Sequence, residues 1–193
     1  MTTPHSFAGH WAAETVQWIT VPAGICRFGD KGRPIKVGAL QWTRTPLTRA
    51  QLGAGSCQLP ATGLTYDEAA AIARALGGRL PRSVEWEWAA AGPETRRYPW
   101  GDTEPDTSRA NLLGGPGAPT PVGAYLAGAT PDGLLDMAGN TWEWTSSSVL
   151  GDGYVVRGAS YASPALYARC TFLNAAPGEL ASAGIGFRVV REA

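Results

Sequence analysis

Few residues of this chain are suited to redox or metal chemistry. Its 193 residues include three cysteines, Cys26, Cys57 and Cys170, and two histidines, His5 and His10. An odd and widely spaced set of cysteines is not the pattern of a disulfide-stabilised fold, so we expect reduced thiols packed as small apolar side chains. Both histidines lie near the start of the chain, which does not match the ligand spacing of a Cys/His zinc site.

The composition indicates one folded domain of neutral charge. Apolar residues make up 44% of the chain and charged residues 17%, and 16 Lys plus Arg balance 16 Asp plus Glu. The neutral balance gives no electrostatic basis for binding nucleic acid or a membrane surface. The sequence contains no run of roughly 18 consecutive apolar residues, the length that a membrane-spanning helix needs. Its first residues lack the charged and apolar stretches of a signal peptide. We expect a cytoplasmic protein when it is made, with surface display or a place on a phage particle left open.

The elements that must position any site are short. A helix is predicted over residues 66–76, because Thr65 is a suitable N-cap, Glu68 completes a capping box and Gly77 follows the last turn. A second helix is predicted over residues 84–91. Runs of β-branched and aromatic residues predict strands, and we expect these to form one short antiparallel sheet. They lie near residues 18–28, 154–158 and 185–191.

Several motifs rich in Trp, Gly and Arg follow one another in an order typical of one protein family. They include Arg79-Leu80-Pro81, Glu85-Trp86-Glu87-Trp88-Ala89-Ala90, Tyr98-Pro99-Trp100-Gly101-Asp102, Gly139-Asn140-Thr141-Trp142-Glu143-Trp144, Val156-Arg157-Gly158-Ala159-Ser160-Tyr161 and Gly184-Ile185-Gly186-Phe187-Arg188. Through them the chain resembles the formylglycine-generating-enzyme (sulfatase-modifying factor) family, which has a C-type lectin fold. The resemblance implies an α+β domain over residues 18–193 after an extension of residues 1–17. It also implies short twisted antiparallel sheets, two main helices, much irregular structure, and pairing of the first and last strands.

The resemblance allows a test for enzyme activity. Enzymes of this family oxidise a substrate cysteine at copper held by two cysteines, since Cu(I) prefers thiolate ligands. Here the first cysteine position falls at Ser163 and the second near residues 166–168, where there is no thiol, while Cys170 matches a later cysteine of many relatives. We therefore expect no copper and no oxidase activity. Relatives that add sulfur to histidine betaine bind iron through histidines of a separate helical domain, and the two histidines of this chain could not replace those.

Within the family, the chain is most similar to the variable proteins of diversity-generating retroelements. In these proteins the C-terminal segment before the last strand changes in sequence at solvent-facing positions, while fixed residues hold the fold. Arg157, Cys170 and residues 185–188 resemble the fixed set. The positions between them carry aromatic anchors with small neighbours, which suit a binding surface. These candidate binding residues are Tyr161, Ala162, Ser163, Tyr167, Phe172, Asn174, Ala175, Gly178, Glu179, Ala181, Ser182 and Ala183.

We therefore predict a ligand-binding protein, a monomer, whose ligand is a protein. Two alternatives stay open. The chain could be an oxidase like the enzymes of the family, or an inactive relative that serves as a structural module.

The family resemblance also maps a structural Ca²⁺ site onto Asp136, Gly139, Thr141 and Glu143. Two carboxylates and two backbone carbonyls from a tight turn are oxygen ligands of the mixed kind that Ca²⁺ takes. A second interpretation is a metal-free turn in which Asp136 caps backbone N–H groups.

Overall fold

The computed structural model describes residues 16–54 and 57–193, so the predicted extension lies outside the described residues as far as residue 15. The described elements, in chain order, are β1 (Trp18–Val21), β2 (Gly24–Phe28), β3 (Arg33–Val37), β4 (Leu40–Thr43), α1 (Tyr66–Ala75), α2 (Ser83–Ala91), η2 (Leu126–Gly128), β5 (Trp142–Ser148), β6 (Gly153–Arg157), η3 (Ala165–Ala168), β7 (Leu173–Pro177), β8 (Ile185–Gly186) and β9 (Val190–Glu192). Here η marks short 3₁₀ helices.

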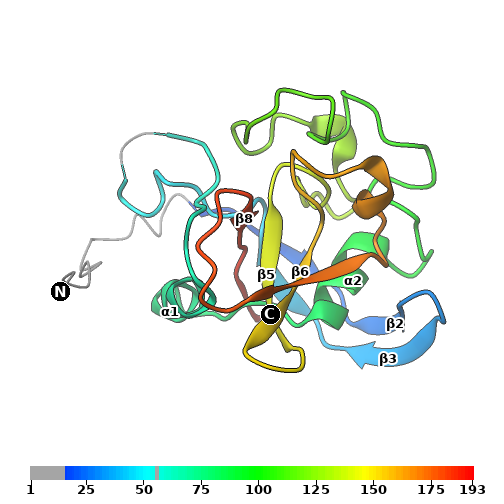
Figure 1. Ribbon diagram of the computed structural model, residues 1–193. Helices are drawn as coiled ribbons and strands as arrows, with labels where there is room; N and C mark the ends of the chain where they lie inside the picture. The colour runs from blue at the N-terminus through cyan, green and yellow to red at the C-terminus, as the bar shows by residue number, and fades with distance from the viewer. Residues whose placement is uncertain (1–15, 55–56) are drawn as a thin grey trace.

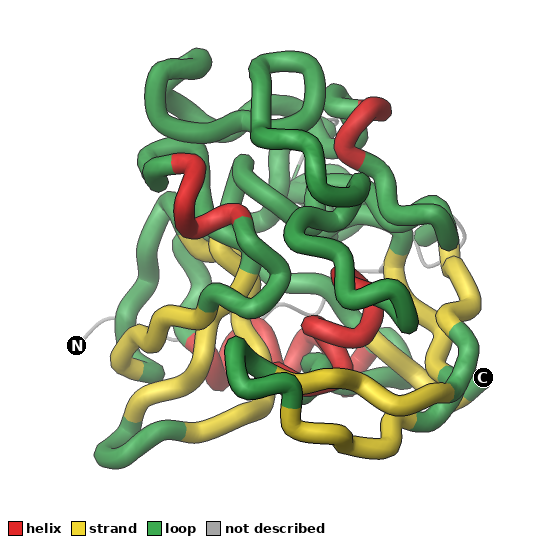
Figure 2. Tube along the Cα trace, turned by 90° about the vertical axis from the view of Figure 1, so that its right-hand side faces the viewer, coloured by secondary structure: helices red, strands yellow, loops and turns green. Residues whose placement is uncertain are grey.

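The strands form three small sheets, and loops make up much of the rest. Their orders are β1-β4-β9, β2-β3 and β7-β6-β5-β8. Figure 1 shows β5 beside β6, and β2 beside β3. Viewed from the side, much of the trace is loop or turn, and the strands gather in the lower half of the view (Figure 2). The predicted α+β class, with two main helices and short sheets, is confirmed.

Helix α1 begins where the capping box predicts. The Thr65 hydroxyl accepts from the Glu68 N–H at 3.3 Å, and the Glu68 carboxylate accepts from the Thr65 N–H at 2.9 Å. Ile72 and Ala73 are buried on one face of the helix and pack into the core. The helix ends one residue before the predicted end, and Gly77 follows with φ 74°, a left-handed conformation that favours glycine.

Helix α2 is buried on nearly every side. Trp86 is fully buried, and Trp88 donates its indole N–H to the Pro22 carbonyl at 2.8 Å. At the start of the helix, the buried Glu85 carboxylate accepts from both terminal nitrogens of Arg79, at 2.7 and 2.9 Å. The two tryptophans hold this helix against elements that lie far away in the sequence, and the ion pair fixes its start to the segment just before it.

The strand pairing corrects two predictions. The region 18–28 holds two strands, β1 and β2, which belong to different sheets, and β6 pairs with β5 and β7 rather than with the first and last strands. The first and last strands do not pair directly, since β1 and β9 flank β4. Proline has no N–H to continue a ladder, so Pro22 is suited to the break between β1 and β2. In addition, β8 runs parallel to β5.

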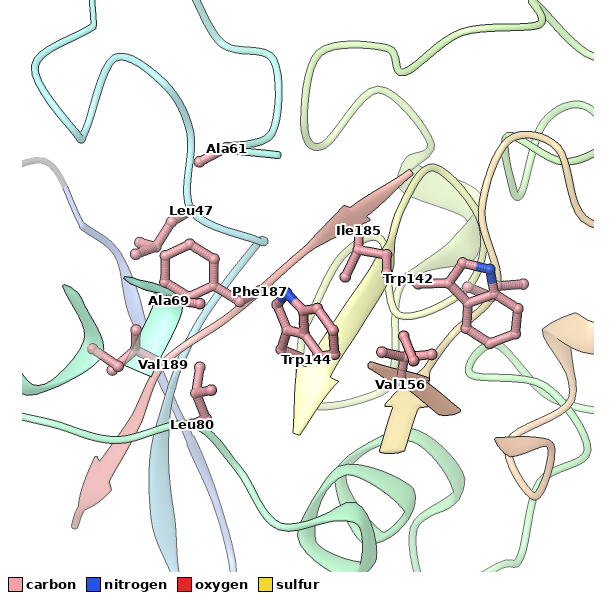
Figure 3. Packing of buried hydrophobic residues seen from close by; sticks show 14 of the residues in the cluster. Leu47, Ala61, Ala69, Leu80, Trp142, Trp144, Val156, Ile185, Phe187 and Val189 are labelled. Carbon is pink, nitrogen blue, oxygen red and sulfur yellow. The ribbon is translucent and has the colours of Figure 1, made fainter. Parts of the chain in front are cut away.

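The buried apolar residues form two clusters, and the larger one lies between α1, the segment after β4 and the C-terminal strands. Figure 3 shows Phe187 between Leu47 and Trp144, with Trp142 and Val156 on the other side of Trp144. Burying such large rings stabilises a domain with little regular structure, because each removes much apolar area from water. Trp142 lies at the edge of this core, and the candidate binding residues begin beyond it.

Candidate functional site

A buried ion pair holds β5 in place beneath the candidate site. Glu143 accepts from Arg188 through two bonds, Nε to Oε2 at 2.8 Å and Nη2 to Oε1 at 2.6 Å, and from the Trp86 indole N–H at 2.7 Å. Arg188 also donates to the Leu135 carbonyl at 3.0 Å. Both charged side chains are 0% exposed, so each depends on the other for its charge to be tolerated.

The predicted calcium residues do not come together as an ion site. Both Glu143 oxygens are taken by hydrogen bonds, and the Arg188 guanidinium would repel a cation placed beside them. The Gly139 carbonyl accepts from the Thr141 N–H at 2.8 Å. Across residues 16–54 and 57–193, no group of three or more His, Cys, Asp or Glu side chains could hold a metal. The residues as placed do not fit Ca²⁺, and calcium binding stays a prediction of the sequence.

Asp136 serves a neighbouring loop instead. It is buried, and its carboxylate accepts from the Gly123 N–H at 2.6 Å, which is the capping role of the metal-free interpretation. Burial raises the pKa of Asp136 from 3.8 to about 6, although the Gly123 N–H and the Arg188 charge oppose this shift. The negative charge of Glu143 adds to it. Asp136 has φ 55°, which is uncommon outside glycine.

The candidate binding residues lie on a surface segment that we call the 161–183 face. Two backbone hydrogen bonds tie it to the scaffold. The Tyr161 N–H donates to the Asn140 carbonyl at 3.1 Å, and the Cys170 N–H donates to the Arg97 carbonyl at 2.8 Å. The buried Arg157 side chain also donates to the Cys170 carbonyl at 2.6 Å. Arg157 and Cys170 therefore hold the segment in place.

Eleven of the twelve candidate binding residues reach the surface. Six are exposed: Ala162, Asn174, Ala175, Glu179, Ala181 and Ala183. Five are half-buried: Tyr161, Tyr167, Phe172, Gly178 and Ser182. The prediction that Ser163 lies on the binding surface is wrong. This serine is 5% exposed, and its hydroxyl accepts from the Ser160 N–H at 3.0 Å, because the turn folds it inward.

Two of the three predicted aromatic anchors form a pair. The rings of Tyr167 and Phe172 stack with their centres 4.3 Å apart, and both lie within 6.3 Å of the Trp142 ring. They pack against the core without being enclosed by it. Tyr161 stands apart from this pair. The rings therefore combine a structural contact on one side with an accessible surface on the other.

A groove of ≈ 370 Å³ opens in the 161–183 face. The buried side chains of Trp142, Val156 and Ile185 form its floor. Its walls include six of the candidate binding residues, Tyr161, Ala162, Asn174, Ala175, Ser182 and Ala183. No charged residue lines it. Trp142 belongs to one of the family motifs, and its place in the floor follows from the pairing of β5 with β8.

The outer strand of this face has a protected edge. Strand β7 pairs with β6 and has no partner on its other side among the described strands. The Ala175 N–H donates to the Asn174 side chain at 2.9 Å, and Pro177 has no N–H to offer. Few backbone donors are therefore left for pairing with another chain. A ligand at this face would meet mainly side chains.

The thiols do not form a reactive pair. Cys26 and Cys170 are buried, and burial raises the pKa of the Cys26 thiol to about 12 and raises that of Cys170 as well. A thiol that keeps its proton is a poor metal ligand and a poor nucleophile. Cys57 is half-buried.

Comparison with known proteins identifies the family. Residues 12–193 match the sulfatase-modifying factor enzyme 1-like domain. The chain belongs to this family. It is 40% identical over 142 residues to the hercynine oxygenase of Mycolicibacterium thermoresistibile, an alignment that covers 60% of this chain and 32% of that protein. It is 42% identical over 102 residues to the formylglycine-generating enzyme of Mycobacterium tuberculosis, covering 46% of this chain and 33% of that enzyme.

The alignments with this chain cover 32% and 33% of these two curated relatives, so the chain spans about a third of their length. Among solved structures, Treponema denticola variable protein 1 has the same fold. It superposes with a TM-score of 0.79 at 17% identity, covering 91% of this chain and 95% of that chain. The predicted resemblance is thus confirmed at the level of family and fold. Within the described residues, no helix is long and apolar enough to cross a membrane.

Proposed function

We propose that this domain is a binding module whose ligand, a protein, docks on the 161–183 face. The observation that carries the proposal is the convergence of three separate stretches on one groove. Residues 161–162, 174–175 and 182–183 line it together, although they are far apart along the segment. The placement of eleven candidate residues at the surface supports the proposal in addition.

The chemistry of the groove favours a neutral, largely apolar group of the ligand. Its floor is aromatic and aliphatic, several of its wall residues have small side chains, and no charged residue lines it. Rings such as Tyr161 and the Tyr167–Phe172 pair supply contact area at low cost in side-chain entropy, and small neighbours leave room for a partner. Exchange of the wall residues would change the shape of the groove and leave its floor intact, which suits a variable protein.

The experiment is site-specific cross-linking. A photoreactive amino acid is placed at Ala162 or Ala175 in the groove walls, and at Leu126, which is exposed and lies outside the groove. We expect the two wall positions to cross-link the same protein and the control position to miss it. Binding of the captured protein is then measured with Ala175→Arg, which should weaken it at least tenfold. Equal cross-linking from all three positions, or unchanged binding by the variant, contradicts the proposal.

We propose further that the domain has no formylglycine-generating activity. Support comes from Ser163 at the first cysteine position and from the buried thiol of Cys170. The test offers a sulfatase-type cysteine peptide with and without Cu(I), followed by mass spectrometry. Formylglycine formed faster than in buffer alone contradicts this proposal.

A second candidate function rests on the sequence similarity to hercynine oxygenases. At 40% identity over 142 residues, it exceeds the 17% identity to the variable protein. On this alternative, the domain contributes part of a small-molecule site that a further domain or protein completes. Calorimetric titration with hercynine distinguishes the two candidates. Saturable binding, lost in Ala175→Arg, favours the oxygenase-like role, whereas no binding together with a captured protein favours the binding module.

A further inference from the structure

A second groove differs in chemistry from the one in the 161–183 face and shares no residue with it. It lies between the start of β1, the segment after β4 and the loop before η2, and its volume is ≈ 290 Å³. Part of its wall is aliphatic, made by Val16, Val122, Leu126 and Leu135. The rest is polar, made mainly by threonine and glutamine side chains and by Arg44. The groove is therefore amphipathic.

Arg44 is the one charged residue in the lining of this groove. No carboxylate of the described residues lies within ion-pair distance of it, while seven other arginines are paired. Asp136 accepts from the Gly123 N–H and is buried behind the groove without lining it. The half-buried residue Arg44 thus lines a cavity that has no counter-charge in its walls.

One solvent-exposed hydrogen bond contacts the guanidinium. Its Nη1 donates to the Gln17 side-chain oxygen at 3.0 Å, which fixes one side of the planar group. Among the described residues no acceptor is found for Nε or Nη2 of Arg44. The N–H groups on Nε and Nη2 run parallel on the same edge of an arginine, and this edge matches the two oxygens of a carboxylate.

We propose that this groove binds a small organic carboxylate. The two carboxylate oxygens accept from Nε and Nη2 of Arg44, and the hydrocarbon part lies against Val122, Leu126 and Leu135. The neutral hydroxyl and amide groups of Thr45 and Gln58 line the same space and can accept or donate hydrogen bonds. This site is independent of the 161–183 face, so its test does not depend on the proposed function.

The test uses acetate, butyrate and hexanoate at constant ionic strength, titrated by calorimetry into the whole chain. We expect saturable binding whose affinity rises by up to about fourfold for each CH₂ buried against the aliphatic wall. Arg44→Gln should lower the affinity for hexanoate at least tenfold. Arg44→Lys should lower it by a smaller factor, because it keeps the charge and loses the paired donors. Arg49→Gln is the matched control, since Arg49 is exposed and does not line the groove.

Leu126→Trp provides a variant that does not depend on the arginine. Leu126 is 69% exposed, so a larger side chain there should fill the groove without disturbing the core, and hexanoate binding should be lost. Three outcomes overturn the proposal. They are absence of saturable binding to any of the carboxylates, equal binding by Arg44→Gln, and binding of inorganic phosphate as tight as that of hexanoate.

Discussion

The Nη2 atom of Arg188 and the Oε1 atom of Glu143 lie 2.6 Å apart in the interior, although 45 residues separate them in the sequence. Both side chains are fully buried. Arg188 also donates to the Thr43 carbonyl at the end of β4 and to the Leu135 carbonyl in a loop. The pair therefore joins β5, the segment between β8 and β9, β4 and that loop. It makes Glu143 part of the scaffold.

Removing one partner of this pair should be costly. We expect Glu143→Gln to lower the free energy of unfolding by about 3–5 kcal/mol, because the Arg188 charge is left buried without its counter-charge. The control is Glu94→Gln, since Glu94 is largely exposed in its pair with Arg96 and should cost less than about 1 kcal/mol. Urea unfolding followed by tryptophan fluorescence measures both. Equal stability of the two variants would contradict the role assigned to Glu143.

Calcium should have little effect on stability. Because both oxygens of Glu143 accept from Arg188, we expect the melting temperature to be the same in millimolar Ca²⁺ and in excess chelator. Differential scanning calorimetry at fixed ionic strength gives the answer, with Mg²⁺ as the control ion. A melting temperature that rises with Ca²⁺ alone would restore the site that the family resemblance implies.

Replacing the aromatic side chains of the 161–183 face by alanine should distinguish surface residues from residues that stabilise the fold. We expect Tyr161→Ala to leave stability nearly unchanged. Phe172→Ala and Tyr167→Ala should each cost about 1–3 kcal/mol, less than the 3–5 kcal/mol of a fully buried ring, because they stack on each other and touch Trp142 from one side only. Thermal and urea unfolding measure these changes. A loss of the full buried-ring value at all three positions would assign the segment to the core.

The raised pKa of Asp136 has a consequence for the pH dependence of stability. Between pH of about 4 and 6 the folded chain keeps a proton on Asp136 that the unfolded chain has lost, so the contribution of this group to the free energy of unfolding falls as pH rises through that window. At about 1.4 kcal/mol per pKa unit, a shift of about two units corresponds to roughly 3 kcal/mol.

The variant Asp136→Asn isolates this effect. Its stability relative to the unmodified chain should increase between pH 4 and 7, since asparagine can still accept from the Gly123 N–H and carries no charge. Other titrating groups affect both proteins alike and cancel in the difference. A difference that is constant with pH would show that Asp136 ionises at its ordinary pKa.

The three thiols should differ in reactivity. We expect iodoacetamide at pH 8 to modify Cys57 in the folded protein and to leave Cys26 and Cys170 unmodified, because burial keeps both thiols protonated and inaccessible. In urea all three should react. Peptide mass spectrometry identifies the sites, and early modification of Cys170 in the folded chain would contradict its place in the core.

The sequence predicted what depends on local chemistry. Thr65 and Glu68 form the capping box expected of them, because its two hydrogen bonds join residues three apart. The outward positions of Ala162 and Asn174 also followed from the resemblance. The sequence could not show that Glu143 meets Arg188, since composition and spacing carry no information on a partner 45 residues away.

The grooves were beyond prediction for the same reason. Trp142 becomes the floor of a groove only because β8 lies beside β5 and β7 lies beside β6. The inward turn of Ser163 depends on its hydrogen bond with Ser160, which the pattern of small residues does not reveal. Arg44 likewise lines a groove only because residues of the loop at positions 122–126, almost 80 residues later in the chain, form another part of its wall.

The protected edge of β7 bears on which substitutions the 161–183 face can tolerate. With the Ala175 N–H engaged by Asn174 and a proline at 177, molecules at high concentration have little opportunity to join their sheets edge to edge. Most side chains of this face could then be substituted without increasing the tendency of the protein to aggregate through its sheet edge. Asn174 is the weak point, because a variant that loses it frees a donor on an outer strand, and such variants should be the first to precipitate on storage.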